Sequence, residues 1–154
     1  MEGLEAVALA VEAGSLTIMT STITRVEVLS AHMNEEQEKT FVRFCQSDKV
    51  NLIAPDTRIT NLASELRSHY VNQGDRLGTP DAIHLATAIN YNATAFHTFD
   101  SKGRKGTLGL LPLSGDVAGH ALEICHPQIP RPPSRQRSSR TPEDSQQGNL
   151  FDES

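Results

Sequence analysis

The sequence predicts an α/β fold that contains a mainly parallel β-sheet. The strongest evidence is the segment Thr79–Ile89, where apolar residues recur at the spacing of a helix. It is followed by Ala93–Asp100, a short β-rich run that ends in a carboxylate. Two further β-rich runs, Leu16–Thr20 and Val50–Ala54, each precede a segment of helical pattern. Strands that alternate with helices in this way are typical of parallel sheets.

One helix is expected before the predicted strand Leu16–Thr20, and another after it. The apolar residues of Gly3–Ala13 lie on one helical face, and Gly14 provides a stop signal after them. A second helix is expected to reach Leu29. Thr24 and Glu27 fit a capping box at its start, because a threonine and a glutamate three residues later can satisfy two free N–H groups.

The middle of the chain predicts two more helices. Asn34 is expected to cap a helix over Glu35–Gln46. Asp56 or Thr57 is expected to cap another, which runs to about Asn72.

The helix over Thr79–Ile89 has strong start signals. Thr79 is a favourable N-cap, and Pro80 is a favourable first helical residue. Asp81 lies in the first turn, where the helix dipole favours a negative charge.

The C-terminal part divides into two regions. Leu110–Leu113 and Ala121–Cys125 are each expected to form a short strand. From Pro127 onward the composition changes to proline, serine, arginine and glutamine. We therefore expect one folded domain over residues 1–126 and a disordered tail over residues 127–154.

The composition indicates a cytoplasmic protein. The chain has 154 residues and no apolar run long enough to span a membrane, and its start lacks a signal-peptide pattern. Cys45 and Cys125 are far apart and lack metal-type spacing, so both are expected to be free thiols. The net charge of −5 argues against coating of nucleic acid by bulk electrostatics.

Three acidic residues occupy equivalent places in the expected fold. Glu27 and Asp81 lie in the first turns of helices, and Asp100 lies at the end of a strand. Parallel neighbouring strands would bring all three to one edge of the sheet. A carboxylate cluster there would fit Mg²⁺ or Mn²⁺, which activates water and stabilises displacement at phosphorus. Taken singly, each acid has a structural alternative: a capping-box residue, a dipole complement or a turn former.

Other side chains near these acids could support the same site. Thr98 points to the same side of its strand as Asp100 and could hydrogen-bond the cluster. His84 lies one turn after Asp81, and packing beneath the site is the expected role. The loop residues Lys102, Arg104 and Lys105 are either a solvated surface or contacts for an RNA backbone.

Three segments together resemble the PIN-domain family, and most closely its VapC-like toxins. The segments are Thr24–Leu29, Thr79–Ala88 and Phe96–Asp100, which look like the second, third and fourth acidic motifs of that family. The resemblance covers about Gly3 to Cys125. It implies a three-layer α/β/α domain with a mainly parallel sheet.

The resemblance also implies a function. VapC-like toxins are metal-dependent endoribonucleases of toxin–antitoxin systems, so Mg²⁺ or Mn²⁺, an RNA substrate, a cognate antitoxin and a homodimer are implied. By position, the metal-ligand roles fall on Glu27, Asp81 and Asp100, and a supporting catalytic role falls on Thr98.

The sequence departs from the family pattern at its start. PIN domains open with a central apolar strand that ends in an aspartate ligand, whereas Met1 already precedes the first expected helix. Two explanations stay open: a start that lies further upstream, with an active ribonuclease as the full product, or a non-catalytic PIN-like binding protein.

The tail contains a second motif. Gln147, Leu150 and Phe151 are spaced as in the short peptides that bind the bacterial sliding clamp. This pattern favours binding of a partner protein by the tail, independently of any catalysis.

Overall fold

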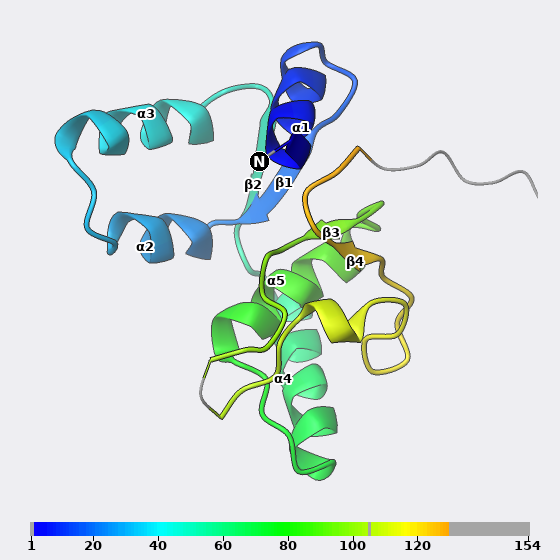
Figure 1. Cartoon of the computed structure of the whole chain (residues 1–154). Coiled ribbons are helices and arrows are strands. Elements are labelled where there is room, and N and C mark those ends of the chain that lie inside the picture. The colour runs from blue at the N-terminus through cyan, green and yellow to red at the C-terminus, as the bar shows by residue number, and fades with distance from the viewer. Residues whose placement is uncertain (1, 105, 130–154) are drawn as a thin grey trace, which may run out of the picture.

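The computed structural model describes residues 2–104 and 106–129, which form an α/β fold of helices and parallel strands (Figure 1). This confirms the expected fold class. The elements, in chain order, are α1 (Glu2–Glu12), β1 (Ile18–Ser21), α2 (Ile23–Leu29), α3 (Glu35–Cys45), β2 (Val50–Ile53), α4 (Thr57–Asn72), α5 (Thr79–Asn90), β3 (Phe96–His97), the 3-10 helix η1 (Leu111–Leu113) and β4 (Ile124–Cys125).

The strands form two separate parallel pairs. In the first pair β1 lies beside β2, with Ile18 opposite Val50. In the second pair β3 lies beside β4, with Phe96 opposite Ile124. Each sheet has two strands, so within residues 2–104 and 106–129 no strand joins β1 to β3.

The unpaired edges of β1 and β3 both face one groove. The N–H groups of Ile18 and Thr22 donate toward β2, at 3.2 and 2.9 Å. Because peptide groups alternate in direction along a strand, those of Met19 and Ser21 face the opposite edge. The N–H groups of Phe96 and Thr98 donate to the carbonyls of residues 123 and 125, toward β4. By the same alternation, the backbone N–H group of His97 faces away from β4.

This groove has a volume of about 820 Å³ and apolar walls. Val7 and Val11 of α1 line it, as do Thr87 and Ala88 of α5. His97 also lines it, and its buried Nε2 has no hydrogen-bond partner among the described residues. Burial lowers the pKa of His97, which keeps the imidazole neutral.

The hydrophobic core is formed mainly by α4 and α5. Leu85 and Ala86 on α5 are fully buried, and Ile59 and Leu66 on α4 are almost completely buried. These residues belong to one cluster that also includes Val117, Leu122 and Ile124. The core therefore holds α5 rigidly, together with the first turn that carries Asp81.

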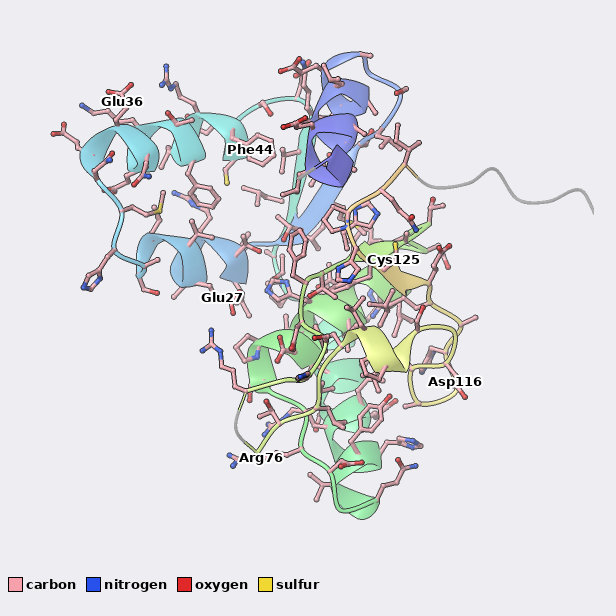
Figure 2. The ribbon with its side chains drawn as sticks, viewed as in Figure 1. Glu27, Glu36, Phe44, Arg76, Asp116 and Cys125 are labelled. Atoms are coloured by element: carbon pink, nitrogen blue, oxygen red, sulfur yellow. The ribbon has the colours of Figure 1, made fainter. Side chains whose placement is uncertain are left out.

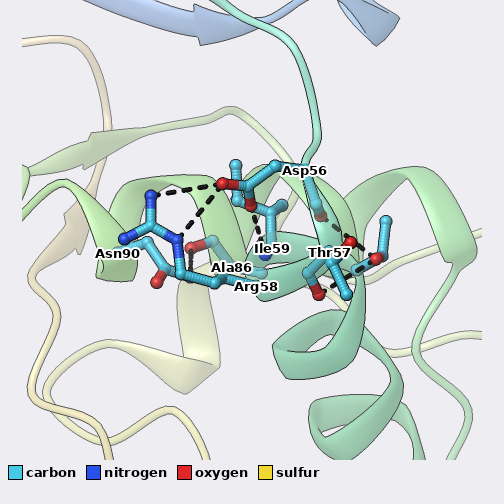
Figure 3. A network of polar contacts seen from close by, with 7 residues as sticks. Asp56, Thr57, Arg58, Ile59, Ala86 and Asn90 are labelled. Carbon is cyan, nitrogen blue, oxygen red and sulfur yellow. Dashed lines mark hydrogen bonds and ion pairs between the residues drawn. The ribbon is translucent and has the colours of Figure 1, made fainter.

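The start of α4 agrees with the sequence analysis (Figure 3). Asp56 is the N-cap, and its Oδ1 accepts a hydrogen bond of 3.0 Å from the Ile59 N–H. Its Oδ2 lies 3.2 Å from the guanidinium of Arg58. These contacts, with the Ile59 hydrogen bond the largest, lower the pKa of Asp56. Asn34 likewise caps α3 and forms a capping box with Gln37.

Two other helix starts differ from the prediction. The predicted capping box of Thr24 and Glu27 is wrong, because α2 already begins at Ile23. The Thr24 hydroxyl instead contacts the Thr20 hydroxyl at 2.6 Å. The N-cap of α5 is Gly78, and Thr79 is already the first helical residue.

Three predicted strands also differ from the structure. The strand expected over Ala93–Asp100 is reduced to the two residues of β3, so Asp100 lies in the following loop. The strand expected over Leu110–Leu113 is wrong, because Leu111–Leu113 form a 3-10 helix around Pro112. Of the run Ala121–Cys125 only the last two residues are a strand. A proline lacks the N–H group that a strand needs, which explains the second difference.

The expected free thiols are observed, with Cys45 buried and Cys125 partly buried. No helix in the described part of the chain has the length and apolarity needed to cross a membrane. The predicted tail lies almost wholly outside the described residues, as do the clamp-like residues Gln147, Leu150 and Phe151.

The buried face of α5 provides a test of the core. We expect Leu85→Ala to lower the free energy of unfolding by about 2–5 kcal/mol, because it leaves a cavity at a fully buried position. Leu9→Ala is the matched control, since Leu9 is 66% exposed on α1. Urea unfolding measures both. Equal losses in the two variants would contradict this description of the core.

Candidate functional site

The three acidic residues come from three different elements. Glu27 lies on α2, Asp81 in the first turn of α5, and Asp100 in the loop after β3. Figure 2 shows Glu27 on the side of α2 that is turned toward α5. Glu27 is exposed, whereas Asp81 and Asp100 are partly buried. Glu27 follows the carboxyl end of β1, and Asp100 follows that of β3. Asp81 lies at the start of α5.

The charges of these carboxylates act on one another. The pKa of Asp81 is raised, first by burial and then by the negative charges of Asp100 and Glu27. Interactions with His84 and Arg104 lower the pKa of Asp81 without cancelling this rise. Ionisation of Asp81 is therefore less favourable than that of a free aspartate, and a bound cation would offset this effect.

Asp100 is held firmly by its own loop. Its Oδ1 accepts a 2.7 Å hydrogen bond from the Gly103 N–H. Its backbone N–H donates to Thr98 Oγ1 at 3.0 Å, and its carbonyl accepts from Leu110 and Leu111 at 3.0 and 2.9 Å. Thr98 therefore supports the Asp100 backbone, and within the described residues its hydroxyl makes no hydrogen bond to a carboxylate of the cluster.

Gly78 allows Asp81 to fold back against the helix start. A Cβ at position 78 would lie 2.6 Å from Asp81 Oδ2, which is closer than non-bonded atoms approach. The backbone of Gly78 has φ −61° and ψ 147°, which any residue can adopt. Space for the carboxylate, rather than backbone freedom, is therefore the reason for glycine at this position.

The contact that the sequence analysis missed is between His84 and Glu27. His84 Nε2 lies 2.8 Å from Glu27 Oε2, so His84 reaches the site and does more than pack beneath it. The only sequence signal was its position one turn after Asp81, on a helix face that also carries buried residues. The partner, 57 residues earlier, could not be identified from spacing.

The donor set matches a hard divalent cation in chemistry. Carboxylate oxygens are the ligands that Mg²⁺ and Mn²⁺ prefer. However, within the ranges that the structure describes, no three His, Cys, Asp or Glu side chains are grouped closely enough to hold a metal ion. The carboxylates influence one another electrostatically, but in the described part of the chain they form no closed set of ligands.

The basic loop lies beside the acids. The Leu108 N–H donates to the Arg76 carbonyl at 2.8 Å, and Thr107 Oγ1 bridges the N–H and carbonyl of Arg104 at 3.0 Å each. The first of these bonds holds the loop against the segment before α5, and the other two close a turn within the loop. Arg104 is near enough for its charge to lower the pKa of Asp81.

Comparison with known proteins identifies the family. The model of the PIN domain matches residues 2–105, which is more than half of the chain. The chain belongs to the PIN-domain family. No curated protein and no solved structure matches it. The match confirms the family resemblance, includes all three acidic residues, and indicates nuclease activity in general terms.

The raised pKa of Asp81 predicts a pH effect on stability. Between the ordinary value of 3.8 and the raised value, the folded chain binds more protons than the unfolded chain. The free energy of unfolding of the metal-free protein therefore falls as pH rises through this window. We expect Asp81→Asn, which cannot ionise, to gain stability relative to wild type over the same rise.

Asp56→Asn is a control of opposite sign. The pKa of Asp56 is lowered, so wild type gains stability from Asp56 as pH rises past that pKa toward 3.8. The variant should therefore lose stability relative to wild type as pH rises. Urea unfolding at a series of pH values, with a chelator present, measures both differences. A flat difference between Asp81→Asn and wild type would exclude a strained carboxylate at position 81.

Proposed function

We propose that this PIN domain is a metal-dependent endoribonuclease of the VapC-like toxin type. The supporting observation is that Glu27, Asp81 and Asp100 lie close enough for two of them to raise the pKa of the third. Three mutually repelling carboxylates are costly unless they serve a cation. Glu27 and Asp100 follow the carboxyl ends of parallel strands, where α/β folds bind ligands, and Asp81 lies in the first turn of α5.

In this proposal Glu27, Asp81 and Asp100 hold Mg²⁺ or Mn²⁺. The bound metal would activate a water molecule and stabilise the charge that develops at phosphorus. Asp100 is suited to its role because Thr98 and the basic loop hold it in place. Arg104, on that loop, is suited to contact a phosphate of the RNA.

The VapC-like resemblance extends the proposal to partners. It implies a cytoplasmic homodimer that is inhibited by a cognate antitoxin. Exposed apolar side chains on α2 and α3 are compatible with such contacts, since Val26 is 70% and Phe44 is 43% exposed.

The alternative is a non-catalytic PIN-like scaffold. Two observations favour it for the chain of 154 residues: the acids in its described part form no closed set of metal ligands, and the edges of β1 and β3 leave a groove between them. A binding role would need neither a complete metal site nor a continuous sheet.

An RNA-cleavage assay distinguishes the ribonuclease proposal from the scaffold alternative. The chain is compared with a version extended before Met1 by an apolar strand that ends in aspartate, each with Mg²⁺ or Mn²⁺. The ribonuclease proposal expects cleavage by the extended form and a loss of at least about a hundredfold in its Asp81→Asn variant. If both forms fold, shown by circular dichroism, and neither cleaves structured RNA, the scaffold becomes the better description.

Gly78→Ala tests the role of Asp81 without removing its carboxylate. The new methyl group would occupy the space of Asp81 Oδ2, so the carboxylate must move. We expect a change in unfolding free energy of at most about 1 kcal/mol, because the backbone conformation suits alanine. Mn²⁺ affinity of the extended form, measured by calorimetry, should fall about tenfold or more. The control is Ala13→Gly, in the loop after α1. Gly74→Ala is unsuitable as a control, because Gly74 has a positive φ that alanine disfavours.

A further inference from the structure

Helix α2 is weakly attached to the rest of the domain. None of its residues is buried, so apolar packing does not set its position. Its first turn is tied to β1 by the contact of 2.6 Å between the Thr24 and Thr20 hydroxyls and by the 3.3 Å bond from the Ile23 N–H to Ser21 Oγ. Glu27 lies one turn further on, beyond the reach of these contacts.

The contact that reaches Glu27 comes from α5, the helix that carries the fully buried residues Leu85 and Ala86. His84 is on α5, between residues that are fully buried, and its side chain is only 16% exposed. The Glu27 side chain is 45% exposed. The bond of 2.8 Å between them therefore connects an exposed side chain on α2 to a largely buried one on α5.

We propose that His84 is a positioning residue, which holds α2 against α5 and thereby places the Glu27 carboxylate beside Asp81. Its effect on metal binding rests on the function proposed above, whereas its effect on α2 does not. The bond engages Oε2 of Glu27 and leaves Oε1 free.

The chemistry of the bond argues against His84 as a ligand through the same atom. An ionised carboxylate only accepts hydrogen bonds, so His84 Nε2 must carry the proton and donate. A protonated ring nitrogen has no lone pair for a metal. Hydrogen bonds of this kind orient metal-binding side chains from outside the ligand set.

The first test uses the metal-free chain. His84→Leu removes the donor and keeps bulk, and His84→Gln keeps an N–H donor on a side chain of similar reach. We expect amide hydrogen exchange in Ile23–Leu29 to become about three- to tenfold faster in His84→Leu and to return toward wild type in His84→Gln. Unchanged exchange in the core of α5 will show that both variants are folded.

Glu27→Ala should accelerate amide exchange in α2 as much as His84→Leu does. The double variant should exchange no faster than either single variant, because both changes break the same bond. Val26→Ala controls for the higher helix propensity of alanine, since Val26 is 70% exposed. Equal exchange in wild type and His84→Leu, or additive effects in the double variant, would overturn the positioning role.

The second test measures Mn²⁺ affinity by electron paramagnetic resonance, on the same variants in the extended form. We expect His84→Leu to weaken binding about tenfold or more and His84→Gln to restore most of it. Spin-echo coupling of Mn²⁺ to a histidine nitrogen that is lost in His84→Leu would instead make His84 a ligand and overturn the proposal. If the exchange effect is present but wild type binds no Mn²⁺, the positioning role stands and the proposed metal-dependent function fails.

Discussion

The burial of α5 is the constraint on which the rest of the site depends. Leu85 and Ala86 are completely buried against α4, so the helix has little freedom to shift or rotate. The same helix carries Asp81 in its first turn and His84 one turn later. Two groups of the site are therefore placed by the core itself. Glu27 and Asp100 reach them from elements that need local hydrogen bonds to hold them, through His84 in one case and through Thr98 and Gly103 in the other.

The fold keeps the Asp81 carboxylate in a position where its negative charge is disfavoured. Burial and the charges of Asp100 and Glu27 raise the pKa of Asp81, and the small residue Gly78 leaves room for its carboxylate to stay close to the helix start. Asp56 shows the contrast, since it too lies at the start of a helix, yet a hydrogen bond and a neighbouring arginine lower its pKa. One acid stabilises its helix, whereas the other is held where its charge is unfavourable. Such a difference is typical of a functional carboxylate.

The divided sheet has consequences for the same region. Peptide groups on the edges of β1 and β3 face a groove instead of another strand, and the buried Nε2 of His97 beside them has no partner among the described residues. Unpaired edges and polar atoms of this kind are costly. The groove also separates the element that leads to Glu27 from the element that leads to Asp100, so the width of the groove affects how closely the acids can approach one another.

The sequence by itself determined the α/β class, the family and the order of the helices and of most strands, because these depend on local periodicity and on motifs such as Thr79–Ala88. It also singled out the three acids as candidate ligands. It also identified the caps at Asn34 and Asp56, whose partners lie three residues away. It misplaced the start of α2, the length of β3 and the nature of Leu111–Leu113, where short segments respond more to their surroundings than to propensity. Only the tertiary structure decided that His84 bonds Glu27, that Gly78 makes room for Asp81 and that the sheet is divided, because each of these depends on groups brought together by packing rather than by spacing along the chain.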